Sequence, residues 1–298
     1  MKKKFYITIC LTLILVILTA CSNNNVKITS AKPVVDENST VATTSIAIMQ
    51  ICEALEIDLV GVPDSNLYEI PDVYSDATVV GHPMSPDMEI VAQLDPDIIL
   101  SPVTLISDLL PKYESSNIDY AFVNLKSVYG MFKSIEELGE MFGKEEKSEV
   151  LMKDFSDYYN TYKKKNEGKK GPKVLLLMGL PGSYVVATEN SYAGSLVDLA
   201  GGVNVYSGTD QEFLNVNVED MIQKDPDIIL RTAHALPEDV MKMFADEFKT
   251  NDIWSHFRAV KENKVYDLPH EYFGMSANFD YAKGLDVLDE LLYGGVNE

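Results

Sequence analysis

The chain has 298 residues, of which 46% are hydrophobic, and it carries a formal charge of −21. That length is enough for two domains of ordinary size, each with its own core. So acidic a chain is unsuited to nucleic acid, because neutralising phosphates requires clustered Lys and Arg. Anionic lipid also requires clustered Lys and Arg, so we expect no basic patch that would bind a membrane surface.

The first 20 residues have the pattern of a secretory signal peptide. Three lysines precede an apolar run from Phe5 to Leu18, and small residues lead into Cys21. The run is too short to span a bilayer comfortably. Leu18 to Cys21 also fits the bacterial lipobox, in which the cysteine is acylated, and an ordinary cleaved signal is the alternative. Removing the signal takes away three lysines and no acids, so the mature charge becomes −24.

We therefore expect an exported protein that is lipid-anchored through Cys21 on the outer face of a bacterial membrane. Polar residues 21–38 would form the tether, and the acyl chains alone would hold the membrane. Cys10 leaves with the signal, so Cys52 is the one interior cysteine and no internal disulfide is expected. Cys52 shares a helical stripe with apolar residues, which indicates a small buried hydrophobe.

From Ser39 onward, short apolar runs alternate with amphipathic stretches, which predicts largely parallel sheets with crossover helices. The expected elements of the first part are a helix over residues 45–55, strands over 59–62 and 78–81, a helix over 86–94 with Ser85 as its N-cap, and strands over 97–101 and 120–123.

A long helix interrupts this alternation at residues 144–165, where Gly and Pro are absent and apolar residues share one face. A polar loop over 163–172 follows, and a strand over 173–178 restarts the alternation. We expect a first lobe over residues 39–143, a connecting helix and loop over 144–170, and a second lobe over 171–298.

An internal repeat supports this division. The six residues from Asp95 to Leu100 recur from Asp225 to Leu230, and Glu89 matches Glu219 at the same offset. The sequence thus predicts an α/β fold of two similar lobes with mainly parallel sheets, joined by one long helix. Ligands of such sheets bind beyond the carboxyl ends of the strands, so we expect a cleft between the lobes.

Common catalytic signatures are missing from the chain, including a phosphate-binding loop with Lys, a Gly-x-Ser-x-Gly elbow and His-Glu-x-x-His. His256 and His270 are interpreted as packed or surface residues. His234 follows a predicted strand, and Met84 is pinned between two prolines beyond another. A thioether from one lobe and an imidazole from the other would suit six-coordinate haem iron.

The chain resembles the haem-binding lipoproteins, the E components, of the iron-regulated surface determinant uptake systems of Gram-positive bacteria. The resemblance covers essentially the whole mature chain. It is carried by residues 41–44 and 83–86, by Met178 to Tyr184, by Asp225 to Leu230 with His234, and by Asn251 to Trp254. These are binding proteins of the long-helix class that serve ABC importers, so the resemblance implies that fold and a haem-transport function without enzyme activity.

The resemblance also assigns site residues. It implies Met84 and His234 as axial ligands of non-covalently bound haem (iron protoporphyrin IX). It implies propionate contacts near Ser45, Ser65 and Asn66. His82 is not a fixed feature of the family, so it remains an alternative to Met84.

The implied partners are an ABC permease with its ATPase and a cell-wall haem donor, and the implied binding protein is a monomer. In this class a glutamate from each lobe docks on the permease, and Glu89 and Glu219 match that pattern. The alternative is that both are solvated helix acids.

Residue chemistry adds two further expectations. Thr44 and Ser45 open a helix directly after a strand, and helix N-termini bind anions through free N–H groups. This matters because the chain has only two arginines, Arg231 and Arg258. Tyr184 could pack on the porphyrin or serve as a core aromatic.

Three other functions compete with haem binding. A receptor for anionic ferric siderophores calls for an Arg-rich pocket, and a zinc or manganese receptor needs three or four convergent His and carboxylate ligands. A haem-modifying enzyme needs an open coordination position on iron, which two protein ligands would close.

Overall fold

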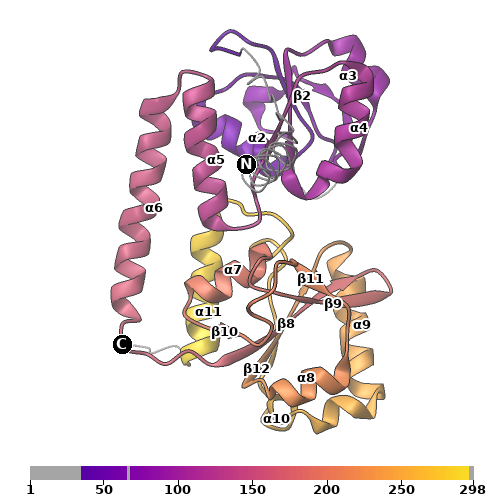
Figure 1. Ribbon diagram of the computed structural model, residues 1–298, viewed down its shortest axis with the longest axis vertical. Coiled ribbons are helices and arrows are strands. Elements are labelled where there is room, and N and C mark those ends of the chain that lie inside the picture. The colour runs from indigo at the N-terminus through magenta and orange to yellow at the C-terminus, as the bar shows by residue number, and fades with distance from the viewer. Residues whose placement is uncertain (1–34, 66–67, 295–298) are drawn as a thin grey trace, which may run out of the picture. The chain divides into compact units, whose positions relative to one another are not determined.

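The structure is a computed structural model that describes residues 35–65 and 68–294 (Figure 1). The signal peptide, Cys21, Asn66 and most of the expected tether lie outside the described residues. Among the helices of the described part, none is long and apolar enough to cross a membrane.

The first lobe is built on a five-stranded sheet in which every neighbouring pair is parallel, in the order β3-β2-β1-β6-β7. Its strands are β1 (Val41–Thr43), β2 (Leu59–Val62), β3 (Thr78–Val79), β6 (Ile98–Pro102) and β7 (Tyr120–Val123). Its helices are α2 (Ile46–Leu55), α3 (Met88–Leu94), α4 (Ile106–Ser116) and α5 (Val128–Met141). The predicted parallel sheet with crossover helices is confirmed.

Cys52 lies on the buried face of α2 and has no exposed surface. Burial raises the pKa of its thiol to about 12, because desolvation disfavours the thiolate. Cys52 is therefore the small buried hydrophobe that the helical stripe predicts.

The second lobe has a mixed sheet in the order β11-β9-β8-β12-β13, with β10 pairing with the first residues of β8. Its strands are β8 (Lys173–Leu180), β9 (Ser183–Ala187), β10 (Val203–Asn204), β11 (Phe213–Leu214), β12 (Ile228–Ala233) and β13 (Val265–Asp267). Its helices are α7 (Tyr192–Leu199), α8 (Val218–Lys224), α9 (Pro237–Thr250), α10 (Arg258–Lys261) and α11 (Tyr281–Tyr293). Antiparallel β9 arises because Gly182 adopts φ of 80° and turns the chain back on β8.

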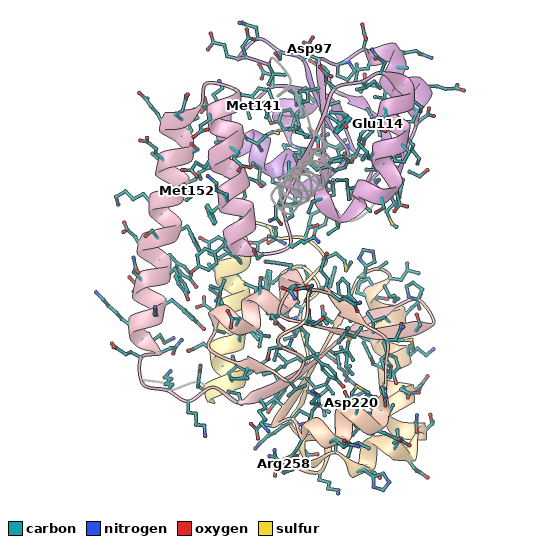
Figure 2. All side chains as sticks on the ribbon, in the orientation of Figure 1. Asp97, Glu114, Met141, Met152, Asp220 and Arg258 are labelled. Atoms are coloured by element: carbon teal, nitrogen blue, oxygen red, sulfur yellow. The ribbon has the colours of Figure 1, made fainter. Side chains whose placement is uncertain are left out.

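The long helix α6 (Glu145–Lys165) begins one residue later than predicted. Its aromatic face packs on α5 and α11, where the Phe132 and Phe155 rings stack with centroids 4.4 Å apart. The hydroxyl of Tyr162 donates a hydrogen bond to the Leu285 carbonyl of α11 at 3.3 Å. Met141 of α5 and Met152 of α6 pack against the same core (Figure 2).

The repeated segments have the same structure in both lobes. Asp87 caps α3 and Asn217 caps α8 with their side chains, and each helix ends in a left-handed Asp, at φ of 48° and 46°. The Asp97 carboxylate accepts from the Thr40 N–H at 2.7 Å, and the Asp227 carboxylate accepts from the Lys173 N–H at 2.8 Å. The repeat is therefore a helix, a left-handed cap and a strand tied to the first strand of each lobe.

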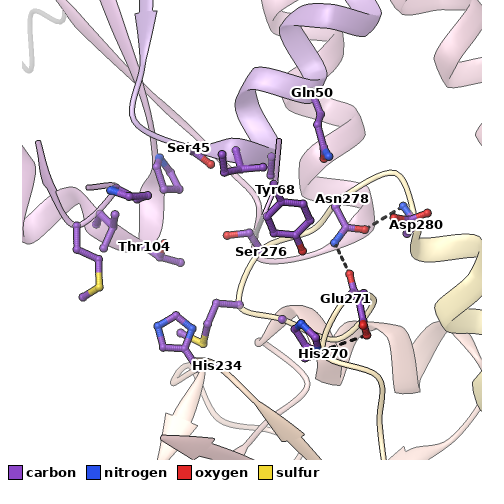
Figure 3. Close-up of a pocket in the computed structure, with 18 of the residues that line it drawn as sticks. Ser45, Gln50, Tyr68, Thr104, His234, His270, Glu271, Ser276, Asn278 and Asp280 are labelled. Carbon is purple, nitrogen blue, oxygen red and sulfur yellow. Dashed lines mark hydrogen bonds and ion pairs between the residues drawn. The ribbon is translucent and has the colours of Figure 1, made fainter. Parts of the chain in front are cut away.

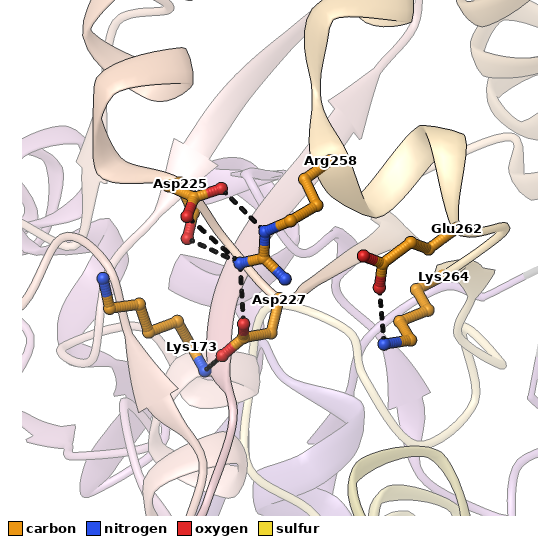
Figure 4. A network of polar contacts seen from close by, with 6 residues as sticks. All are labelled: Lys173, Asp225, Asp227, Arg258, Glu262 and Lys264. Atoms are coloured by element: carbon orange, nitrogen blue, oxygen red, sulfur yellow. Dashed lines mark hydrogen bonds and ion pairs between the residues drawn. The ribbon is translucent and has the colours of Figure 1, made fainter.

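The two copies differ in their ion pairs. In the second lobe, the Arg258 guanidinium bonds both Asp225 and Asp227, with its shortest contact at 2.7 Å to Asp227 (Figure 4). Lys173 contributes its backbone N–H to the same carboxylate. This network ties α10 to the start of β12.

Two expectations from the sequence are corrected by the structure. The helix expected over residues 86–94 begins at Met88 with Asp87 as N-cap, because Ser85 and Pro86 form strand β5, which pairs with β4 (Gly81–His82). The expected absence of a basic patch is also wrong. Six lysines lie between residues 163 and 173, where α6 ends, and five of them are exposed. Net charge does not report such local clustering.

Candidate functional site

A pocket of about 330 Å³ lies where strands of both lobes end (Figure 3). Volumes of this order are typical of small-molecule sites. It is lined from the first lobe by Ser45, Ile46, Ala47, Gln50, Tyr68, Pro83, Met84, Pro102, Thr104 and Leu105, and from the second by Ala233, His234, His270, Glu271, Gly274, Met275, Ser276, Asn278 and Asp280. The pocket therefore lies beyond the carboxyl ends of β1, β6 and β12, where the sequence predicts a ligand site.

Met84 reaches the pocket from the turn of a hairpin. Strands β4 and β5 pair His82 with Ser85, so Pro83 and Met84 form the two-residue turn between them. Gly81 permits the approach with φ of 97°, where another residue would be strained. Met84 is 52% exposed, which leaves its thioether free to contact a ligand rather than fill the core.

His234 enters from the opposite lobe, directly after β12. Its backbone N–H donates to the Gly179 carbonyl at 3.0 Å, so the end of β8 fixes the position of the residue. Partial burial lowers the pKa of His234 below its ordinary value of 6.5, because desolvation disfavours the imidazolium. The neutral ring, which is the form that ligates metals, is thus favoured at neutral pH.

The amino end of α2 forms a third part of the lining. The Ser45 hydroxyl accepts from the Ile48 N–H at 3.5 Å, so Ser45 is the N-cap of α2. The first N–H groups of a helix lack intrahelical partners, and Ile46 and Ala47 carry them here, beside the pocket. Thr44 is fully buried, and its hydroxyl contacts the Ser101 hydroxyl at 2.7 Å. Thr44 therefore supports the wall without lining it.

A segment that sequence reasoning did not assign to the site closes the pocket. Residues 270–280 cross from β13 towards the first lobe, where the Ala277 N–H donates to the Leu125 carbonyl at 2.8 Å. They contribute His270, whose Nδ1 lies 3.3 Å from a Glu271 carboxylate oxygen. Its apolar residues Phe273, Met275, Ala277 and Phe279 alternate as in a strand, but the segment forms neither a helix nor a strand. The sequence pattern therefore does not predict that this segment lines the pocket.

Three other predicted residues lie outside the lining. The Tyr184 hydroxyl donates to Glu247 at 3.1 Å, and its ring packs beside Phe244 and Trp254 in the core of the second lobe. Of the two roles considered for Tyr184, the structure shows the core aromatic. The His82 Nδ1 accepts from the Met84 N–H at 3.3 Å, so that ring folds back on its own hairpin.

Ser65 also lies outside the lining, and its hydroxyl accepts from the Tyr68 N–H at 3.0 Å. Tyr68, three residues further on, lines the pocket instead. Burial is the first cause that raises the pKa of the Tyr68 phenol, and the nearby Glu271 and Asp280 carboxylates add to it.

No Lys or Arg side chain occurs among the described residues that line the pocket. Arg231 pairs with Asp267 at 2.7 Å and lies over the Phe248 ring, and Arg258 belongs to the network in Figure 4. Within residues 35–65 and 68–294, no group of three or more His, Cys, Asp or Glu side chains could hold a metal ion. The acids Glu271 and Asp280 also make the pocket a poor site for a multiply charged anion.

Glu89 and Glu219 occupy the same position, second in α3 and second in α8. Both are exposed, and neither side chain has an ion-pair partner among the described residues. They project from equivalent helices of the two lobes.

Comparison with known proteins gives concordant matches. Residues 41–272 match the periplasmic binding protein family. The chain is 40% identical over 293 residues to the high-affinity heme uptake system protein IsdE of Staphylococcus aureus (strain Newman), with 97% of each chain covered. Similar solved structures include an ABC transporter substrate-binding protein from Listeria monocytogenes EGD-e, with a TM-score of 0.82 and 42% identity, and S. aureus IsdE complexed with heme, with a TM-score of 0.81 and 41% identity. In both, 86% of this chain and 99% of the other chain are covered.

Proposed function

The chain belongs to the periplasmic binding protein family, and from this premise we propose that it is a cell-surface haem receptor for an ABC importer. It binds haem non-covalently between its two lobes and delivers it to a permease and its ATPase for iron acquisition. The observation that carries this proposal is a pocket that combines Met84 and His234, from opposite lobes, and that has no Lys or Arg among its described lining residues.

Met84 and His234 are the proposed axial ligands of the haem iron. A thioether and a neutral imidazole on opposite walls suit an iron held from both faces of a flat ring. Apolar residues on both walls, including Ile46, Leu105 and Ala233, offer the porphyrin an apolar surface.

The propionates require another source of positive potential, because no Lys or Arg lines the part of the pocket that the structure describes. The amino end of α2, beside Ser45, supplies free N–H groups and the positive end of the helix dipole. Ser65 and Asn66 are proposed to extend this contact, with Asn66 outside the described residues. Glu271 and Asp280 lie at another part of the lining, so the propionates would point away from them.

Three competing functions are less well supported. A pocket without arginine is poorly matched to anionic siderophores, and no cluster of metal ligands occurs in the described part of the chain. A haem-modifying enzyme would need a free coordination position, which ligation by both Met84 and His234 removes.

The remaining assignments follow from the same role. Cys21 would carry the lipid anchor, residues 39–143 and 171–298 would be the functional lobes, and 144–170 their connection. Glu89 and Glu219 would pair with arginines on the two permease subunits, since two carboxylates at equivalent positions suit a two-fold partner. A cell-wall protein would donate the haem, and the receptor would act as a monomer.

Titration of the purified apo-protein with haem, followed by visible absorption, tests the proposal. We expect saturation at one haem per chain and a low-spin, six-coordinate spectrum. A high-spin spectrum at saturation would favour the enzyme, and no saturable binding would rule out the haem receptor.

A further inference from the structure

The end of α6 carries the strongest local concentration of positive charge in an acidic protein. Residues 163–173 contain six of the 25 Lys and Arg residues and one acid, Glu167. Five of the six lysines are exposed, and Lys169 is half-buried. We call this set the basic end; it comprises Lys163, Lys164, Lys165, Lys169, Lys170 and Lys173.

Only part of this charge has a structural use. Lys165 and Lys169 lie 2.8 and 3.7 Å from the Asp289 carboxylate, which ties α6 to α11. Lys163, Lys164 and Lys170 have no ion-pair partner among the residues that the structure describes. Three lysines in the last turn of a helix complement its dipole. This effect does not explain the three lysines that follow the helix, at positions 169, 170 and 173.

The basic end also borders a concavity of about 590 Å³. Its lining includes Lys163, Lys164 and Lys169 together with the rings of Tyr159, Tyr162 and Tyr293. Lysines beside tyrosines are the side chains that occur where proteins contact lipid headgroups, since the rings are apolar with a polar tip.

We propose that the basic end is a docking surface for the anionic phospholipid headgroups of the membrane. The mature charge of −24 does not prevent this, because charges beyond a Debye length of roughly 8 Å at physiological salt are screened. Each lysine close to an anionic leaflet contributes roughly fivefold in binding.

The expected lipid anchor permits this orientation. Thirteen residues lie between Cys21 and Val35, and the fourteen Cα-to-Cα steps of that extended chain span at most about 50 Å. Helix α6 is about 32 Å long at 1.5 Å per residue, and its other end pairs with the first lobe through Lys147 and Glu56 at 2.6 Å. An anchor attached to the first lobe can therefore reach a membrane that contacts the far end of α6.

Vesicle binding of the mature chain with Cys21→Ser, which removes acylation, tests the proposal. The wild-type surface should bind vesicles of equal phosphatidylglycerol and phosphatidylcholine, should not bind pure phosphatidylcholine, and should dissociate at 0.5 M salt as a roughly 4 Å Debye length predicts. The variant Lys163→Glu, Lys164→Glu, Lys170→Glu should bind the anionic vesicles at least about tenfold more weakly.

A matched control separates local from total charge. The variant Lys242→Glu, Lys249→Glu, Lys261→Glu changes three exposed lysines of α9 and α10 by the same total charge, and it should bind like the parent. Equal loss in both variants, or equal binding of the parent to both vesicle types, would overturn the proposal. Thermal unfolding and haem titration of each variant identify misfolding and keep this test separate from that of haem binding.

Discussion

The two proposed iron ligands in the pocket lining, Met84 and His234, differ in ligand strength. An imidazole nitrogen binds haem iron more strongly than a thioether does. We therefore expect His234→Ala to weaken haem binding by more than about 100-fold, which exceeds the loss of affinity typical when a residue that only orients a metal ligand is removed. Met84→Ala should cost about tenfold, because water or His82 can take the vacated position. Haem titration measures both effects, and the absorption spectrum reports the spin state.

The matching control for this pair is His82→Ala. The His82 ring folds back on its own hairpin, so its loss should leave the low-spin spectrum intact. Wild-type spectra from both single variants would refute the ligand assignment. A Met84 effect that appears only when His82 is also changed would identify His82 as the native ligand.

Acid should release haem through His234. Burial lowers the pKa of this imidazole below 6.5, so the neutral, ligating form persists to lower pH than in a free histidine. Haem affinity should therefore be flat from pH 8 to about pH 6.5 and fall below it as protons compete with iron. Affinity that rises as the pH falls through this range would contradict the role of His234.

Among single residues, the sequence indicates Met84 and His234 as candidate ligands because each follows the end of a predicted strand, and strand ends define the pocket in this fold. Tyr68, His270 and Met275 also line the pocket and were missed. They lie in segments that form neither a helix nor a strand, where only the folded chain determines which side chains face inward. Tyr184 is the opposite case, a candidate pocket residue that does not line the pocket. Its place in a motif shared with the family does not reveal that its ring faces the core.

Among the elements, the sequence predicts long helices best. Helix α6 is found to within one residue, because 21 residues of apolar periodicity outweigh local effects. The β4–β5 hairpin was missed because each strand has two residues, too few for any alternation. Its geometry depends on Gly81 and on the pairing of His82 with Ser85. In the sequence, however, Ser85 followed by Pro86 has the pattern of a helix start, and that pattern led to the wrong prediction.

The equivalence of α3 and α8 leads to a prediction about transport. Changing both Glu89 and Glu219 to Ala should leave haem affinity unchanged while haem uptake by cells falls several-fold, because lost bidentate pairing weakens permease docking. Uptake assays in cells with matched surface expression measure this.

A suitable control for docking changes Asp87 and Asn217, the caps of the same helices. Their replacement by Ala should cost each helix about 1 kcal/mol of stability without selectively lowering uptake. Normal uptake by the stably expressed glutamate double variant would refute the docking role.

Over the whole molecule, one buried hydrophobic cluster includes residues of both lobes and of α6 and α11. Tyr158 and Tyr162 of α6 add hydrogen bonds to α11 carbonyls. A core that is continuous between the lobes resists large rotation, so haem entry should require only small movements. The repeat in the sequence reveals two lobes, but not that their cores join, since this contact involves residues far apart in the chain.

Membrane attachment is also a property of the whole chain. Replacing Cys21 by Ala should release the protein from membranes washed in 0.5 M salt, which also removes the contact of the basic end, or should leave the signal uncleaved, because position 21 then offers no thiol for acylation. Fractionation with a mass measurement of the mature amino terminus distinguishes these results. A Cys21→Ala protein that remains acylated and membrane-bound to the wild-type extent would show that the anchor lies elsewhere.

A crystal structure of the haem-loaded protein would show whether one haem lies between the lobes with its iron bound by Met84 and His234. We predict the Met84 Sδ and an imidazole nitrogen of His234 at bonding distance on opposite faces of the iron, with the propionates at the amino end of α2. Iron bound by any other pair of side chains, or haem bound outside this pocket, would refute the assignment of Met84 and His234 as ligands.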